Sequence, residues 1–312
     1  MRSLNVTAYG GPEVLEIAEV PEPTATDGQV RVRMQAAAVN PVDQLTRQGF
    51  MAGLTPGIEF PFTLGFDVAG ILLDDAGSLA AGQRVVGLLP WLARPGLGSN
   101  AEVVSVDPAW LAPLPDEIDW AVAGTLPVNA LAAHQALELA GPASWSDQTV
   151  LVTGAGGAVG AFAVQLAVAR GARVLATASA YDEEFVAGLG AEVITRGPAE
   201  EMVDRVTSLV PGGVDVLFDT AGIGAAILPA TRDAGVFVAP SPPLAPASER
   251  GVRVEAVDSK PDADVLGSIA KEVASGALVS RVADFVPLAQ ARSAHHRAAA
   301  GGLRGKIVLD FS

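Results

Sequence analysis

The hydrophobic positions of the chain follow two different patterns. Up to about Trp110, short apolar or alternating runs are separated by Gly, Pro and Asp, as in the VRVRM segment Val30–Met34. Runs of this length bounded by turn residues are typical of β-strands and indicate an all-β, barrel-like module. Further strands of this kind are expected at Val68–Leu73, Arg84–Leu89 and Ala101–Val106.

From Val150 onward, strand-like and helix-like segments alternate. This rhythm predicts a parallel sheet that is covered by helices on both faces. The expected strands are Val150–Gly154, Arg173–Ser179, Glu192–Thr195, Val214–Gly222, Gly235–Pro240 and Val252–Val257. The expected helices are Val159–Arg170, Glu183–Gly190 and Glu200–Val210. After Ser259 the pattern gives a helix (Asp262–Gly276), a strand (Arg281–Leu288), a helix (Gln290–Gly301) and a last strand (Lys306–Phe311).

Two helices are expected between these regions. The first begins within the segment PDEIDWAVAG, with Asp116 as its cap and Asp119 favouring the positive helix end. The second runs from Pro127 to about Ala140, where Gly141 and Pro142 end it. A proline-rich connection at Pro240–Pro246 is expected to be a surface or active-site loop.

Composition narrows the class of protein. A chain of 312 residues is longer than one hydrophobic core usually covers, so two domains are expected. The net charge of -15 disfavours nucleic acid and anionic membranes as partners. Because cysteine is absent, a disulfide, a thiolate nucleophile and a Cys-ligated zinc are all excluded. The three histidines are too few for most His-built metal sites.

Nothing near the N-terminus resembles a signal peptide, so a cytoplasmic location is expected. Residues 150–169 form an uncharged stretch long enough to cross a bilayer. We interpret this stretch as part of a soluble domain, because the glycines that follow Thr153 would leave backbone groups without partners in lipid.

The strongest chemical signal is the glycine cluster VTGAGGAVG, which lies between an expected strand and an expected helix. At such a turn the backbone can approach a pyrophosphate closely, and the amides of the helix N-terminus can bind it. Gly154, Gly156 and Gly157 suit the turn, and Gly160 lets the helix pack on the sheet. The predicted dinucleotide site also includes the intervening residues Ala155, Ala158 and Val159. The alternative is a purely structural glycine turn.

The form of the coenzyme depends on the end of the following strand, where NAD-binding domains carry an acidic residue for the ribose. Here the strand ends in ATAS, without a carboxylate, so NADP is favoured over NAD. Ser179 and Arg196 are candidates for binding the 2′-phosphate, although Arg196 can equally be a surface residue. Asp182 and Glu183 do not suit a phosphate and are interpreted as compensating a helix dipole.

Taken together, several segments resemble the medium-chain dehydrogenase/reductase superfamily, in its zinc-free quinone oxidoreductase (zeta-crystallin-like) branch. The resemblance implies a GroES-like, partly open β-barrel catalytic domain at 1–122 and 260–312, and a Rossmann NADP-binding domain at 123–259. It also implies NADPH in the cleft between the domains and a homodimer. The matching segments are Tyr9–Pro23, Ala36–Gly49, Leu64–Gly70, Gly82–Leu88, Leu126–Leu137, Val150–Ser179 and Arg304–Phe311.

The same resemblance implies that the catalytic metal is absent. Zinc-dependent members carry a Cys near the position of Asn40 and a GHE motif where this chain has Gly65, Phe66 and Asp67. Asn40, in the NPxD motif, is then expected to orient cofactor and substrate, or else to be a loop residue that satisfies its own backbone. Asp43 is expected to cap a helix, and Asp67 to cap or brace the core. The remaining expected cofactor contacts are Asn129, Thr220, Gly222, Ala239 and Lys306.

These features predict an NADPH-dependent, metal-free reductase that transfers a hydride to a quinone or a similar conjugated carbonyl. Enoyl-thioester reductases of the family use a Tyr as proton donor where this chain has Phe50, which favours acceptors protonated by solvent. Two alternatives remain: an enoyl reductase acting on a polyketide-like intermediate, and a non-catalytic NADPH-binding protein. Residues expected either to line the substrate pocket or to pack in the core are Phe50, Met51, Phe60 and Trp91.

Overall fold

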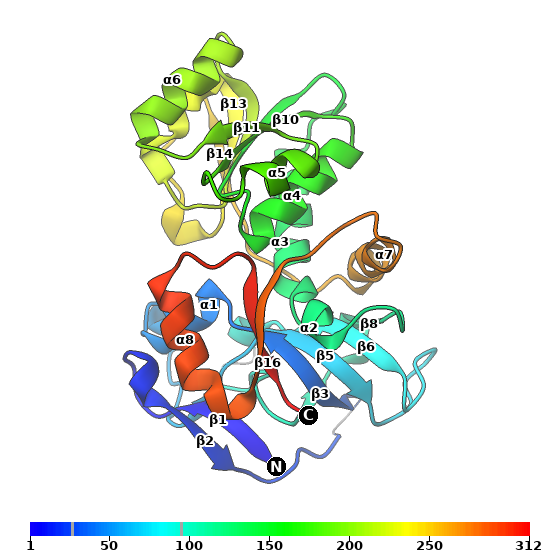
Figure 1. Ribbon diagram of the computed structural model, residues 1–312. Helices are drawn as coiled ribbons and strands as arrows, with labels where there is room; N and C mark the ends of the chain where they lie inside the picture. The colour runs from blue at the N-terminus through cyan, green and yellow to red at the C-terminus, as the bar shows by residue number, and fades with distance from the viewer. Residues whose placement is uncertain (26–27, 94–95) are drawn as a thin grey trace. The chain divides into compact units, whose positions relative to one another are not determined.

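The computed structural model describes residues 1–25, 28–93 and 96–312. These residues form two compact units (Figure 1). The first unit comprises Met1–Leu131 and Lys260–Ser312, and the second comprises Ala132–Ser259. Residues 123–131, which the sequence-based division assigned to the nucleotide-binding domain, lie in the first unit. The chain passes from the first unit into the second within a helix, α3 (Leu126–Ala140).

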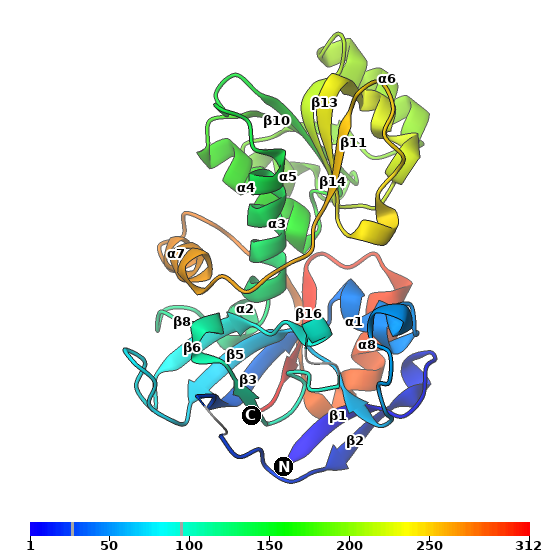
Figure 2. The ribbon, with the colours of Figure 1, turned by 180° about the vertical axis from the view of Figure 1, so that it is seen from behind.

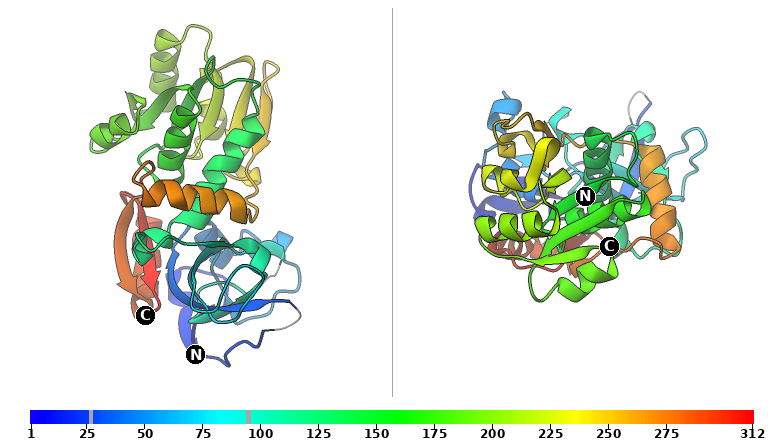
Figure 3. Two further views of the ribbon diagram at one scale, coloured as in Figure 1. Left: turned by 90° about the vertical axis from the view of Figure 1, so that its right-hand side faces the viewer. Right: turned by 90° about the horizontal axis from the view of Figure 1, so that it is seen from above.

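The first unit is built on two sheets. The smaller sheet has the order β2-β1-β4, and the larger one has the order β15-β16-β3-β5-β6-β8, with β7 also pairing with β3. All pairs are antiparallel except β15 with β16, which lie side by side in Figure 3. The strands are β1 (Arg2–Val6), β2 (Leu15–Glu19), β3 (Val30–Ala38), β4 (Phe62–Thr63), β5 (Asp67–Leu72), β6 (Arg84–Leu88), β7 (Val103–Val106), β8 (Leu111–Pro113), β15 (Val282–Pro287) and β16 (Lys306–Asp310).

Strand β3 lies at the centre of this unit because its sequence suits burial. Val30, Val32 and Met34 alternate with more polar positions and are buried, as the period-2 pattern predicts. The strand pairs with three others, so it connects the N-terminal region to the C-terminal strand β16. The two sequence regions expected to form the GroES-like domain are therefore joined in one sheet.

The helices of the first unit are α1 (Pro41–Arg47), α2 (Trp120–Ala123), α7 (Ala263–Ala274) and α8 (Ala291–Ala300). The expected cap of α2 was wrong, because the helix begins after Asp119 and not after Asp116. The side chain of Arg84 donates hydrogen bonds to the carbonyl oxygens of Pro115, Asp116 and Ile118. These bonds hold the segment before Asp119 in a non-helical turn.

The second unit contains a six-stranded sheet with the order β11-β10-β9-β12-β13-β14 (Figure 2). Every strand pair in it is parallel, which confirms the expected Rossmann-type sheet. The strands are β9 (Thr149–Thr153), β10 (Arg173–Ala178), β11 (Glu192–Thr195), β12 (Val214–Asp219), β13 (Thr231–Ala239) and β14 (Arg253–Ala256). The helices are α4 (Ala158–Ala169), α5 (Glu183–Gly188) and α6 (Ala199–Leu209).

Both faces of this sheet are buried beneath helices. Leu151, Leu175 and Leu217 pack with Met202 and Val206 of α6 on one face. Their sequence neighbours point to the opposite face, where α4 contacts β9 and β10. Continuous apolar strands are expected when helices cover both faces of a parallel sheet. The uncharged stretch at 150–169 consists of most of β9, the glycine turn and α4, and most of its residues are buried. No helix in the described part of the chain is long and apolar enough to span a membrane.

Candidate functional site

The first candidate site lies at the start of α1, where the NPxD motif forms a capping arrangement. Asn40 has an extended backbone, and Pro41 occupies the first helical position, where its missing N–H group costs nothing. The Asp43 carboxylate (Oδ2) accepts a hydrogen bond from the backbone N–H of Asn40 at 2.8 Å. Asp43 therefore caps α1, as the sequence predicted, and holds Asn40 at the end of the helix.

Asp67 at the start of β5 fixes the side chain of Asn40. Its Oδ2 accepts a hydrogen bond from Asn40 Nδ2 at 2.6 Å, and its Oδ1 accepts one from the backbone N–H of Val128 at 2.8 Å. Val128 lies in the first turn of α3, whose amides lack partners within the helix. Asp67 thus braces two helix starts.

The polar groups of this cluster are buried and only partly satisfied. Asn40, Asp43 and Asp67 have no exposed surface. Within the described residues, Asp43 Oδ1 has no hydrogen-bond partner. The side chain of Asn40 faces the backbone N–H of Asp43 in the capping box, but its Oδ1 makes no hydrogen bond of normal geometry among these residues. Lys306 is close to this cluster. The carbonyl oxygen of its neighbour Ile307 accepts a hydrogen bond from the N–H of Val39, the residue before Asn40. The cluster therefore combines an oriented amide with two acids and a base.

Burial shifts the ionisation of all three charged groups. It raises the pKa of Asp43 to about 7 and that of Asp67 to about 6. Burial also lowers the pKa of Lys306 to about 8, while the two nearby carboxylates oppose this change. The pKa values of all three groups therefore lie nearer to neutral pH than those of exposed side chains of the same types.

The glycine turn before α4 is tied to the neighbouring strand β10. Thr177 accepts the N–H of Gly154 with its hydroxyl oxygen (3.0 Å) and the N–H of Ala155 with its carbonyl oxygen (3.0 Å). Gly154 has φ +62°, a conformation that side-chain-bearing residues rarely adopt. The turn is therefore fixed by the strand beside it, and Thr177 has a role that sequence analysis missed.

The same turn is shaped for a phosphate group. A Cβ atom on Gly160 would lie 2.5 Å from the carbonyl oxygen of Gly154, so only glycine lets α4 approach the turn this closely. A Cβ atom on Gly157, the N-cap of α4, would contact only that same oxygen, at 3.2 Å. The amides of Ala158, Val159 and Gly160 form the first turn of α4 and lack partners within the helix. The residues present fit the pyrophosphate of a dinucleotide.

Polar contacts also hold the carboxyl ends of β9 and β12 together. Thr153 Oγ1 donates to Asp219 Oδ1 at 2.6 Å, and Asp219 Oδ2 accepts the N–H of Gly224 at 2.7 Å. Thr220 Oγ1 donates to the carbonyl oxygen of Thr153. The loop that contains Thr220 and Gly222, both predicted to line the cofactor, is therefore anchored next to the glycine turn. This anchoring depends on Asp219, which the sequence did not single out.

Three other predicted cofactor contacts are already engaged within the protein. Ala239 is buried at the end of β13, and its carbonyl oxygen accepts the N–H of Val257. Ser179 Oγ donates to Asp182 Oδ2 at 2.7 Å. Asn129 Nδ2 donates to the carbonyl oxygen of Thr125 at 2.7 Å, while its buried Oδ1 lacks a partner in the described part of the chain.

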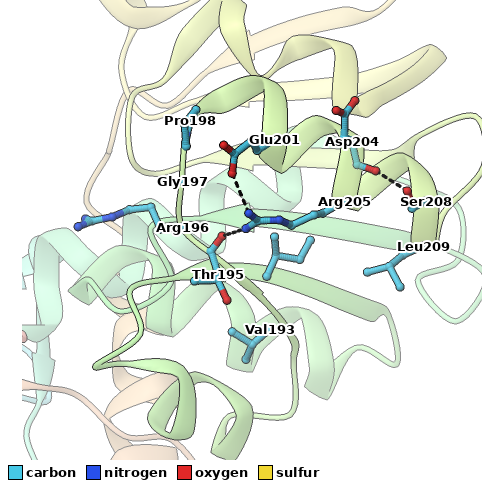
Figure 4. A pocket seen from close by; sticks show the side chains of 11 residues that line it. Val193, Thr195, Arg196, Gly197, Pro198, Glu201, Asp204, Arg205, Ser208 and Leu209 are labelled. Carbon is cyan, nitrogen blue, oxygen red and sulfur yellow. Dashed lines mark hydrogen bonds and ion pairs between the residues drawn. The ribbon is translucent and has the colours of Figure 1, made fainter.

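Arg196 follows β11 and is exposed. Its side chain points away from a cavity between β11 and α6, although Arg196 is part of the lining (Figure 4). The guanidinium group inside that cavity belongs to Arg205, which pairs with Glu201 and with the carbonyl oxygen of Thr195. The positive charge inside this cavity, that of Arg205, is therefore already paired within the protein. The residues that line the cavity lie between Val193 and Leu209 and do not include the glycine turn.

The four predicted pocket residues differ in exposure. Phe50 is 73% exposed and Phe60 is 41% exposed, whereas Met51 and Trp91 are buried. Trp91 Nε1 donates to the carbonyl oxygen of Thr63, so this side chain is a satisfied core residue. Phe62 contacts both Phe60 and Trp91, at ring-centroid distances of 5.3 and 5.7 Å. Of these residues, Phe50 and Phe60 offer open aromatic surface to a ligand.

No three Cys, His, Asp or Glu side chains within residues 1–25, 28–93 and 96–312 lie close enough together to hold a metal ion. At the two positions that the resemblance assigns to metal ligands, Asn40 donates to Asp67 and Phe66 has no ligand atom.

Comparisons with known proteins agree with this geometry. Residues 26–116 match the alcohol dehydrogenase GroES-like domain, and residues 189–309 match a zinc-binding dehydrogenase family. The chain is 32% identical over 248–249 residues to two plant reductases, among them an NADPH-dependent alkenal/one oxidoreductase of Arabidopsis thaliana. That match covers 77% of this chain and 62% of the relative. The chain spans about three fifths of the length of several curated relatives that it matches.

Two solved structures are similar over nearly their whole length. A quinone oxidoreductase from Coxiella burnetii has a TM-score of 0.86 and 25% identity, with 99% of each chain covered. An NAD-dependent alcohol dehydrogenase has a TM-score of 0.83 and 28% identity, also with 99% of each chain covered. The chain belongs to the medium-chain dehydrogenase/reductase superfamily, in its zinc-free quinone oxidoreductase branch.

The buried carboxylates give stability a defined pH dependence. Because burial raises the pKa of Asp43 above its usual 3.8, the folded protein binds this proton more tightly than the unfolded chain does. The resulting stabilisation is complete below pH 4 and is lost as the pH rises through about 7. We expect Asp43→Asn to stabilise the protein relative to wild type more at pH 7.5 than at pH 4.5, as measured by urea unfolding.

Asp74→Asn is the matched control for this experiment. Hydrogen bonds from Arg31 lower the pKa of Asp74 to about 2, so Asp74 is ionised at both pH values in folded and unfolded protein. Its substitution should change stability equally at pH 4.5 and 7.5. An Asp43→Asn effect that is also equal at the two pH values would contradict the assigned shift.

The glycine turn can be tested by adding a charge to it. Gly157→Asp would place a carboxylate in front of the first amides of α4, where the pyrophosphate should bind. We expect this variant to lose detectable binding of NADPH and NADH, as measured by calorimetry, while its circular dichroism stays unchanged.

Gly188→Asp serves as the control, because it adds the same charge to the same unit. Gly188 is exposed, and a Cβ atom there would meet nothing within 4 Å. Its nucleotide affinity should equal that of wild type. Wild-type affinity in the Gly157→Asp protein would show that the nucleotide binds elsewhere.

Proposed function

We propose that this protein is a reductase that uses a nicotinamide dinucleotide to deliver a hydride to a quinone or a similar conjugated carbonyl. The glycine turn before α4 carries this proposal, because its close backbone approach and first-turn amides suit a pyrophosphate. The sequence predicts NADPH as the hydride donor, and the name of the Arabidopsis relative also contains NADPH. The bound dinucleotide would supply the hydride, and the protein would supply binding and orientation.

The acceptor class is supported by the names of the similar proteins. One is an alkenal/one oxidoreductase and another is a quinone oxidoreductase. Quinones and enones are electrophilic before they bind, so hydride can be added without a metal that polarises the substrate. The open aromatic surfaces of Phe50 and Phe60 suit a flat substrate of this kind.

Asn40 is the residue that we assign to positioning. Its Nδ2 group is held by Asp67, and its side chain also faces the backbone N–H of Asp43 in the capping box, so the amide has a fixed orientation. Positioning a donor and an acceptor accounts for a large part of many rate enhancements, so a fixed amide of this kind is useful to a hydride-transfer enzyme. Each reduced acceptor also needs a proton, which we assign to solvent because Phe50 stands where the family's enoyl-thioester reductases use a Tyr.

The assembly that the resemblance implies is a homodimer formed by sheet extension. Strand β14 supports this proposal because it is one of the two outer strands of the six-stranded sheet, with β13 as its partner among the described strands. An outer strand of this kind can pair with a second copy. The expected cytoplasmic location remains a prediction from the sequence.

A panel of acceptors tests the proposed activity. We expect nucleotide oxidation, followed by its absorbance, with a simple quinone and a conjugated enone but not with an enoyl thioester. Turnover confined to the thioester would instead support the enoyl reductase alternative. Nucleotide binding without turnover of any acceptor would support the non-catalytic alternative.

Within this panel, Asn40→Ala should lower kcat by about 100-fold, because misplacement of a reacting group has effects of this size. Its nucleotide affinity should change much less, since the glycine turn stays intact. Gln48→Ala, at the exposed end of α1, is the control and should retain wild-type kcat. Equal kcat values for the two variants would remove Asn40 from the proposed mechanism.

A further inference from the structure

Three exposed aromatic side chains lie together just beyond the end of α1. A Cβ atom added to Gly49 would lie 3.0 Å from Cγ of the Tyr9 ring, and Phe50 is the next residue. Tyr9 also meets Phe60 edge to face, at a ring-centroid distance of 4.9 Å and an interplanar angle of 83°. Tyr9 is 38% exposed, so it adds to the open surfaces of Phe50 and Phe60. We call Tyr9, Phe50 and Phe60 the aromatic platform.

Backbone contacts hold the platform in place. Arg47 Nη1 donates to the carbonyl oxygen of Gly10 at 2.7 Å, and the N–H of Gly10 donates to the carbonyl oxygen of Arg47 at 3.1 Å. Gly49 has φ +88°, which favours glycine, and any side chain there would displace the Tyr9 ring. Arg47 has no exposed surface, so its part is to fix the loop after β1 against the end of α1.

A row of aromatic rings connects the platform to the region of Asn40. Phe60 is followed by Phe62 and Trp91, and the centroid of Trp91 lies 6.0 Å from that of Phe66. Phe66 directly precedes the carboxylate that accepts a hydrogen bond from Asn40 Nδ2. Because each ring packs against the next, the platform and Asn40 belong to one continuous packed layer.

Helix α1 sets the separation between the platform and Asn40. The helix begins directly after Asn40 and ends at Arg47. An α-helix rises by 1.5 Å per residue, so this separation is about 10 Å. We assign the reacting part of the acceptor to Asn40, and the platform is too far from Asn40 to contact the same atoms. It is placed to bind a part of the acceptor that lies several bonds from the reacting carbonyl.

The platform favours one kind of substituent at that distance. Exposed apolar side chains that gather in one place mark binding sites, whereas single exposed ones are ordinary. Any apolar substituent gains from burial there. An aromatic ring gains in addition from edge-to-face or offset contact with other rings, which an alkyl group cannot make.

We propose that the aromatic platform binds an aryl substituent of the acceptor, and that Tyr9 thereby determines a specificity for aryl-substituted conjugated carbonyls. This inference rests on the proposed function, because it names the substrate class of the same site. Tyr9 was not among the pocket residues expected from the sequence, since its place beside Phe50 depends on the contact with Gly49.

Binding of unreactive ketones by the full-length protein is the first test. Benzylacetone carries a phenyl ring, and its cyclohexyl counterpart has the same carbon skeleton without aromaticity. By calorimetry, wild type should bind benzylacetone about fivefold more tightly than the cyclohexyl ketone, because only the phenyl ring makes the additional aromatic contact. This comparison needs neither a variant nor turnover.

The second test compares two enones in variants of Tyr9. Benzylideneacetone takes up a hydride and a proton at its carbon–carbon double bond to give benzylacetone, and the second enone has a methyl group in place of phenyl. The readout is the ratio of their kcat/KM values, in which a general loss of folded enzyme cancels. Tyr9→Leu should lower this ratio about fivefold, mainly through the KM of benzylideneacetone. Tyr9→Phe keeps the ring and should keep the ratio.

Phe285→Leu is the matched control for Tyr9→Leu. Phe285 lies on β15 in the same unit and is 39% exposed, so the variant removes an aromatic ring of nearly equal exposure. Its ratio should equal that of wild type. An equal fall of the ratio in Phe285→Leu and Tyr9→Leu would overturn the inference.

Two further results separate this inference from the proposed function. Turnover of both enones with an unchanged ratio in Tyr9→Leu would reject the platform and leave the proposed function intact. A preference for benzylacetone that Tyr9→Leu abolishes, without nucleotide oxidation by any acceptor, would support the platform as a binding site and reject the proposed function. Equal or tighter binding of the cyclohexyl ketone by wild type would overturn the inference without any variant.

Discussion

The buried carboxylate of Asp67 is the interaction on which the first unit depends most. A charge without exposed surface is costly unless hydrogen-bond donors surround it, and here the donors come from Asn40 and Val128. Those two residues begin α1 and α3, so satisfying one carboxylate fixes the start of two helices. The second of these helices, α3, continues into the other unit. The hydrogen bond from Val128 to Asp67 therefore fixes the start of the helix through which the chain passes between the units.

The two units use the same means to place a helix N-terminus. In the first unit, a side chain from strand β5 holds the starts of α1 and α3. In the second, Thr177 of strand β10 holds the turn before α4. In each case a polar residue on a strand accepts a backbone N–H at or just before a helix start, that of Val128 in the first unit and that of Gly154 in the second. Groups that are held in place in this way need little reorganisation during a reaction.

A feature of the fold or of the site could be predicted from the sequence when the contacts that determine it join residues close together in the chain. The parallel sheet follows from the alternation of apolar strands and helices between Val150 and Val257, so it was predictable. The start of α2 was not, because Arg84 holds the preceding segment from more than 30 residues away. The position of Asp182 against Gly156 was not predictable for a similar reason, because the sequence at the end of β10 does not show that the chain then reverses toward the glycine turn. The shifted pKa values of Asp43, Asp67 and Lys306 also require a fold that brings these residues together away from solvent.

The contact between Gly156 and Asp182 has an evolutionary consequence. Codons for aspartate and asparagine differ at a single base, so one point mutation can remove the charge beside the turn while the length and shape of the side chain persist. Such a change lies in the second unit, whereas Phe50 and Phe60 lie in the first, so it leaves their exposed aromatic surfaces unchanged.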